Sequence, residues 1–194
     1  MTAPANRESQ PDARARILAA TRSLVARGGA AEVSIGNVAK GAHVSKALIH
    51  YHFRDKDSLL LALIEEVGHV VLTRAREANR SDADAHVLDQ HWEWLERELA
   101  TGDLRILLAL AETGHDRVRM AARRIADERR SVAAGQVGHI FARLGLTSRV
   151  PPELMAETVV AFTDGLAACH GLDSERNPRP AFDVLWLALL TLAE

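Results

Sequence analysis

The fold is decided by residues 34–60, SIGNVAKGAHVSKALIHYHFRDKDSLL. This stretch contains three favoured helix N-caps, each before a run that suits a helix: Ser34, Ser45 and Asp55. The spacing predicts two helices of about eight residues each, joined by the turn Ala42-His43-Val44-Ser45. Two short helices joined by a tight turn have the geometry of a helix-turn-helix.

Helical patterns continue on both sides of this stretch. From Asp12 an apolar stripe near the helical period runs to Gly28 and Gly29, which suit the end of a helix. Another helix is expected from Lys56 to about Asn79. Five further helical segments follow, approximately 85–99, 104–111, 117–144, 151–171 and 182–192. The sequence has no strand signal, so we expect an all-α protein of about nine helices.

The composition of the 194-residue chain is that of a globular protein, with 47% hydrophobic and 26% charged residues. A single cysteine, Cys169, excludes an intramolecular disulfide, and no apolar run is long enough for a membrane span. The first residues do not resemble a signal peptide, so we expect a cytoplasmic protein. Although the net charge is −2, residues 1–60 carry nine Lys/Arg against five Asp/Glu. This modest excess, unless it is chance, suggests that the N-terminal third meets a polyanion.

Residues 34–60 resemble the DNA-binding segment of the TetR family of transcriptional regulators. The matching features are Ser34, Val38-Ala39, Val44-Ser45, Phe53, Lys56 and Leu59-Leu60. Residues 1–11 are polar and contain two prolines, so we expect a disordered tail there. The resemblance implies a helix-turn-helix domain over 12–55 and a helical effector-binding and dimerisation domain over 56–194.

The function implied by this resemblance is sequence-specific binding to double-stranded DNA. A homodimer would recognise a palindromic operator and act as a repressor that a small apolar or amphipathic effector releases. Residues implied to contact DNA are Ser34, Ser45, Lys46, Ala47, His50, Tyr51, His52 and Lys56. In the family pattern Lys56 reaches a backbone phosphate, and the exposed side of the helix after the turn enters the major groove.

The sequence departs from the family pattern at three histidines. His43 stands where glycine is usual, in a turn that needs a left-handed residue, so we expect some backbone strain there. His50 and His52 replace two tyrosines, which places titratable groups at the expected DNA surface.

The last two helices are too apolar for an end that faces solvent, which favours a four-helix dimer interface. Its expected residues are Met155, Val159, Phe162, Leu166, Leu185, Trp186 and Leu189. The alternative is that these helices only close the monomer core. The resemblance also implies an effector pocket among the middle helices, for which the candidates are His91, Trp92, Leu95, Leu107, Leu110, Glu112, His115, Met120, Phe141 and Phe162. Plain core packing is the alternative for each of them.

Other classes of function have weaker support in the sequence. A regulator without an effector is one alternative, and a helical carrier or enzyme is another. The chain has no GxGxxG, GxxxxGK[ST] or GxSxG motif, so we expect no enzymatic activity and no cofactor. His86 and His91 are five residues apart and do not form a His-x3-His pair, so no metal site is expected.

Overall fold

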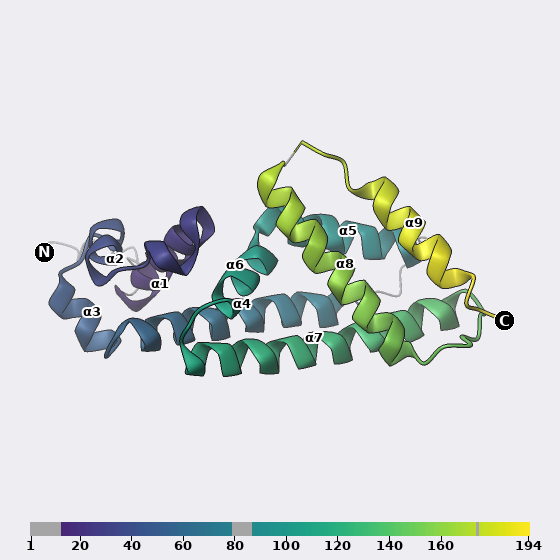
Figure 1. Ribbon diagram of the computed structural model, residues 1–194, viewed down its shortest axis with the longest axis horizontal. Helices are drawn as coiled ribbons and strands as arrows, with labels where there is room; N and C mark the ends of the chain where they lie inside the picture. Colours follow the sequence, from purple (N-terminus) through teal and green to yellow (C-terminus); the bar gives the residue numbers. More distant parts are fainter. Residues whose placement is uncertain (1–12, 79–86, 174) are drawn as a thin grey trace, which may run out of the picture.

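The computed structural model describes residues 13–78, 87–173 and 175–194, and these ranges form an all-α fold (Figure 1). The described helices are α1 (Ala13–Gly28), the 3-10 turn η1 (Gly29–Glu32), α2 (Ile35–Ala42), α3 (Lys46–His52), α4 (Lys56–Ala78), α5 (Val87–Thr101), α6 (Asp103–Ala111), α7 (Asp116–Arg143), α8 (Pro152–Leu172) and α9 (Arg179–Leu190). The only β pairing in these ranges is an isolated bridge between Ser148 and Ala193. The tail expected over 1–11 and the histidine at position 86 lie outside the described residues.

The three N-caps expected from the sequence are present. Ser34 Oγ accepts a hydrogen bond from the Asn37 backbone N–H at 3.1 Å, and Ser45 Oγ accepts one from Leu48 at 3.1 Å. Asp55 Oδ1 accepts from the Ser58 N–H at 2.7 Å, and hydrogen bonds from Ser58 lower the pKa of this carboxyl. Each cap satisfies a backbone donor that the first turn of a helix leaves free, which allows helices as short as α2 and α3 to form.

The turn between α2 and α3 contains the strained residue that the sequence predicted. His43 has φ 54° and ψ 49°, the left-handed conformation that glycine adopts without steric cost. Its backbone N–H faces the last carbonyls of α2, and the N–H of Val44 donates to Ala39 O at 3.0 Å. The chain therefore reverses here despite the Cβ of His43.

The long helix α4 connects the two ends of the molecule (Figure 1). Helices α1–α3 gather at its N-terminal end, α7 lies along it, and α8 crosses α7. The buried face of α4 includes Leu60, Leu63, Ile64 and Val67, all fully enclosed. Because one continuous helix belongs to both ends, a change in the packing of the body can reach the helix-turn-helix.

Most helix limits agree with the sequence-based ones to within a few residues, and the largest shift is in the last helix. It begins at Arg179 and not at Phe182, because Pro180 occupies the first turn, where proline loses no hydrogen bond. No described helix is long and apolar enough to cross a membrane.

An aromatic cluster attaches α9 to α5. The His91 ring stacks on Trp94, with centroids 5.1 Å apart, and meets Trp186 edge-on at 5.3 Å and Phe182 at 5.9 Å. Burial lowers the pKa of His91 to about 4, since removal from water disfavours the charged ring. His91 is therefore a neutral core residue at pH 7.

This burial predicts a loss of stability in mild acid. As the pH falls from about 6.5 towards 4, the unfolded chain gains a proton at His91 that the folded chain does not accept. The free energy of unfolding should therefore decrease over this window, by up to about 3 kcal/mol from this residue alone. Urea unfolding of wild type and His91→Phe at a series of pH values measures the effect as the difference between the two curves. Parallel curves would contradict it.

Candidate nucleic-acid interface

The helix α3 is held by one face and presents the other to solvent. Ile49 and the following Phe53 are buried, and Leu48 is half-buried, so these side chains attach α3 to the bundle. On the opposite face five side chains are exposed, as the sequence predicted: Ser45, Lys46, Ala47, His50 and Tyr51. Tyr51 is 82% exposed, with most of its ring available to a partner.

The side chain of Lys46 lies over the first turn of α2. A Cβ placed on Gly36 would be 3.9 Å from both Lys46 Nζ and Ser34 Oγ, so an ammonium and a hydroxyl flank the start of this helix. The Ser34 oxygen already accepts from Asn37, which leaves its O–H free to donate outward. Unpaired backbone N–H groups at a helix N-terminus favour an anion, and a cation beside them adds to this preference. The three features together suit one phosphate.

The two histidines of α3 occupy different environments. His50 is exposed, and its Nδ1 lies 3.4 Å from the carbonyl oxygen of Arg54. His52 is half-buried, and its ring meets Tyr51 edge-on with centroids 5.2 Å apart. His52 therefore supports the Tyr51 ring from the side and does not stand on the outer face with the other five residues.

Lys56 does not join the other expected DNA contacts. Its ammonium donates to Ala30 O at 3.1 Å, which ties the first turn of α4 to η1. The side chain is half-buried and lines a hollow of about 360 Å³ between η1 and the α6–α7 turn. To reach a phosphate, Lys56 would have to break this hydrogen bond, and its phosphate contact stays a prediction.

A capped helix, a tight turn and a second helix with an exposed polar face define a helix-turn-helix protein of the DNA-binding class. Residues 17–63 match the family described as "Bacterial regulatory proteins, tetR family". This similarity identifies a TetR-family DNA-binding domain over residues 17–63.

One relative and two solved structures are similar to this chain along most of its length. The HTH-type transcriptional regulator BetI of Ectopseudomonas mendocina (strain ymp) is 28% identical over 198 residues, covering 93% of this chain and 95% of BetI. A TetR family regulator from Agrobacterium tumefaciens has a similar fold, with a TM-score of 0.76, 15% identity, and 94% and 98% of the two chains covered. The regulator FadR of Bacillus subtilis, solved in complex with stearoyl-CoA, has a TM-score of 0.69 and 18% identity, with 90% and 97% covered.

The residues expected at the dimer interface are mostly internal to the monomer. Met155, Val159, Trp186 and Leu189 are buried, and the remaining three, Phe162, Leu166 and Leu185, are half-buried. Both helices are apolar on more than one side, so four of the seven residues belong to the monomer core, and a dimer interface on α8 and α9 stays a prediction. Their exposed apolar side chains are Leu154, Leu172, Val184 and Leu187.

The residues expected in the effector pocket do not surround one cavity. Trp92, Leu95, Leu107, Leu110 and Phe141 are buried core residues, while Phe162 is half-buried. His91 belongs to the aromatic cluster, and Met120 is 61% exposed on α7. Glu112 and His115 line the hollow beside Lys56, where His115 Nδ1 lies 2.9 Å from Asp57 Oδ1. The spacing of apolar residues predicts which segments are helical, but it cannot show which faces of those helices line a cavity.

Sequence reasoning missed a buried ionic network between the two ends of the molecule. Asp103, at the start of α6, is fully buried and pairs with Arg22 of α1 and, at 2.8 Å, with Arg74 of α4. Arg74 also binds both oxygens of the buried Glu98, at 2.5 and 2.8 Å. The hydrogen bonds to Glu98 and Asp103 raise the pKa of the Arg74 guanidinium above its ordinary value. Acidic residues beside helix breaks are usually exposed, so no local signal distinguished these two.

The different positions of Lys46 and Lys56 predict different effects on DNA binding. Lys46→Ala should weaken binding to DNA from the region flanking the protein's own gene. It should reduce the slope of log affinity against log salt by about 0.9, the value for one lost phosphate contact. Lys56→Ala should leave the slope unchanged, because its ammonium is bound to Ala30.

Fluorescence anisotropy between 50 and 300 mM salt measures both slopes, after circular dichroism has shown that each variant is folded. Equal slopes for wild type and Lys46→Ala would remove Lys46 from the interface. A slope change confined to Lys56→Ala would show that this lysine leaves Ala30 on DNA.

Proposed function

We propose that this regulator is a repressor that acts as a homodimer on a palindromic operator in the cytoplasm and has no enzymatic role. The observation that carries the proposal is the exposed face of α3, together with Lys46 and Ser34 at the start of α2. Ser34 and Lys46 hold a phosphate and set the register, while Ser45, Ala47, His50 and Tyr51 face the base edges. His52 supports Tyr51. Two copies of α3 then enter successive major grooves about 34 Å apart.

The exposed apolar face of α8 and α9 supports the dimer. Leu187 is 66% exposed and Leu172 is 90% exposed, so pairing with a second copy would remove large apolar side chains from water. Gly165, Ala168 and Ala188 are also exposed on these helices, and their small side chains permit close packing between helices. A two-fold interface needs only one such self-complementary surface, and it matches the symmetry of a palindrome.

A narrow slot inside the body supports binding of a small apolar or amphipathic effector. Helices α4 to α8 line it, with Val71, Leu104 and Val159 as apolar walls. Its polar groups are Arg129, Gln136 and Thr163, and the buried Trp94 Nε1 has no hydrogen-bond partner among the described residues. The slot holds only about 20 Å³, room for roughly one water, so an effector would bind a conformer in which it is wider. A regulator whose slot stays closed, without an effector, is the second candidate.

The ionic network gives the effector a route to the DNA-binding end. Leu104 lines the slot, and the preceding Asp103 holds Arg22 of α1. Opening the slot displaces α6, and Asp103 moves with it. Because Arg22 lies in the same bundle as α3, the separation of the two recognition helices in the dimer changes with the position of α6. This coupling gives the effector different affinities for the two conformers, as release from DNA requires.

The network also predicts an unequal cost for the loss of two aspartates. Asp103→Asn leaves Arg22 and Arg74 without a buried counter-charge and should lower the free energy of unfolding by about 3 kcal/mol. Asp127→Asn removes an exposed ion pair with Arg130 and should cost less than about 1 kcal/mol. Urea unfolding followed by circular dichroism measures both. If the free energy of unfolding falls equally in the two variants, the buried network does not stabilise the contact between the two ends of the molecule.

DNA from the region flanking the protein's own gene tests the dimeric repressor. Wild type should protect two half-sites one helical turn apart in a footprint and sediment as a dimer. Leu187→Glu puts a charge on the exposed face of α9, where the monomer has room for it, so the variant should fold but sediment as a monomer. Its operator affinity should fall by at least a hundredfold, because two half-sites no longer bind together.

Met120→Glu is the matched control, since Met120 has a similar exposure and lies in the first turns of α7, on another helix. It should keep the dimer and the footprint. A dimeric Leu187→Glu protein would exclude this interface, and a wild type that protects no part of the flanking DNA would count against repression at its own gene.

A further inference from the structure

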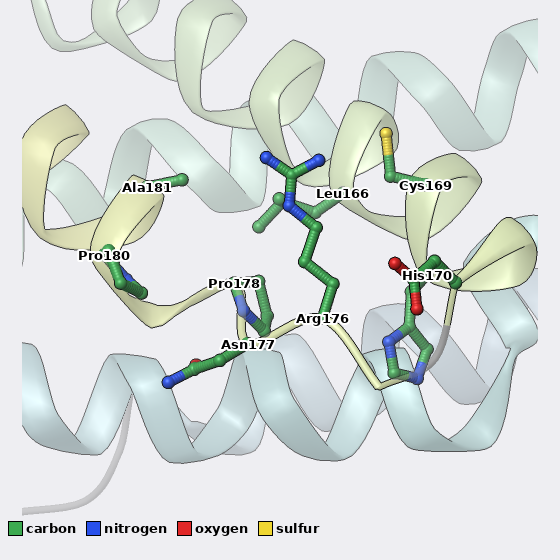
Figure 2. A pocket seen from close by; sticks show the side chains of 9 residues that line it. Leu166, Cys169, His170, Arg176, Asn177, Pro178, Pro180 and Ala181 are labelled. Atoms are coloured by element: carbon green, nitrogen blue, oxygen red, sulfur yellow. The ribbon is translucent and has the colours of Figure 1, made fainter.

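A cavity of about 330 Å³ lies between the end of α8 and the loop that leads into α9 (Figure 2). It is separate from the slot inside the body and from the α3 surface. Its apolar walls are formed by Leu166, Pro178, Pro180 and Ala181, and two charged residues of the loop, Asp173 and Arg176, also line it. The volume is at the lower end of the range for ligand pockets, about 300 Å³, so it suits a small molecule rather than a nucleotide cofactor.

Neither of the two charges in this cavity has a partner of opposite sign among the described residues. Arg176 extends across the opening towards α8 (Figure 2) and forms no ion pair with any described residue. Asp173 Oδ1 accepts a hydrogen bond from the Glu175 backbone N–H at 3.2 Å and no ion pair is formed with Arg176. By contrast, Arg179, just beyond the loop, is paired with both Asp89 and Asp183.

A third polar group in the cavity wall is unsatisfied. His170, on the last turn of α8, lines the cavity, and its Nδ1 is buried without a hydrogen-bond partner among the described residues. This nitrogen has no surface open to the cavity, so the charges that face the cavity are those of Asp173 and Arg176.

We propose that this cavity binds an α-amino acid with an apolar side chain. The carboxylate of the ligand pairs with the guanidinium of Arg176, the fork geometry that arginine offers to carboxylates. The ammonium pairs with Asp173, and the side chain packs on Leu166, Pro178 and Pro180. A simple organic anion would place its negative charge beside the carboxylate of Asp173. A simple amine would place its positive charge beside the guanidinium of Arg176. A zwitterion satisfies both.

Three probes of similar size separate the contributions of the two charges: L-leucine, 4-methylpentanoate, which lacks the ammonium, and 3-methylbutylamine, which lacks the carboxylate. Isothermal titration of the full chain should give leucine a Kd at least tenfold lower than either analogue. Arg176→Gln should remove the advantage of leucine over the amine, and Asp173→Asn its advantage over the carboxylate. Arg119→Gln, which removes an exposed guanidinium of α7 far from the cavity wall, should leave all three affinities unchanged.

Alkylation of the single cysteine of the chain tests whether the ligand binds in this cavity. Cys169 lines the cavity and its side chain is exposed, so bound leucine should slow its alkylation by iodoacetamide at least threefold. Arg176→Gln should lose this protection. Leucine binding without protection of Cys169 would place the site elsewhere, and equal affinity for all three probes, or no binding, would overturn the proposal. None of these readouts involves DNA, so the result is independent of the repressor function.

Discussion

The structure depends on one constraint: the carboxylate of Asp103 is fully enclosed and must be neutralised where it lies. Arg22 and Arg74 do this from two different helices, and Glu98 completes the charge balance around Arg74. The position of α1 relative to α4, α5 and α6 is therefore fixed by ionic contacts as well as by apolar packing. Apolar surfaces can slide by small steps, whereas a buried ion pair loses much of its energy when its atoms separate. The network thus makes the junction between the two ends well defined.

The exposed surface of α3 is likewise determined by the few contacts that hold this short helix in place. A helix of seven residues cannot be stable alone, so Ile49 and Phe53 must hold it, and Ser45 must cap it. Because packing and capping use these three residues, only one narrow face of α3 is free to contact a partner. That face carries the exposed side chains of Lys46, His50 and Tyr51.

Local patterns predicted the helix-turn-helix well because its determinants are local. A serine cap acts within three residues, and the left-handed conformation of His43 follows from the tightness of a four-residue turn. Four of the seven residues expected at the dimer interface are buried in the monomer for a physical reason. Both Leu154 and Met155 are apolar, and only the packing of α8 on α7 turns the second inward. The Asp103 network joins residues distant in sequence, and the cavity beside Arg176 depends on how the loop after α8 folds back on that helix. The sequence without its fold gives no signal for either.

The nearly closed slot lined by Leu104 and Trp94 has a consequence for the dose at which a sensor responds. If only a fraction of molecules has the slot open, the apparent dissociation constant is the intrinsic one divided by that fraction. A slot open in about one molecule in a hundred would raise the response threshold about a hundredfold. The effector concentration at which such a sensor responds is then determined by how tightly its core packs. Substitutions in Val71 or Val159, which line the slot, would retune it through the fraction of open molecules as well as through their own contacts to the ligand.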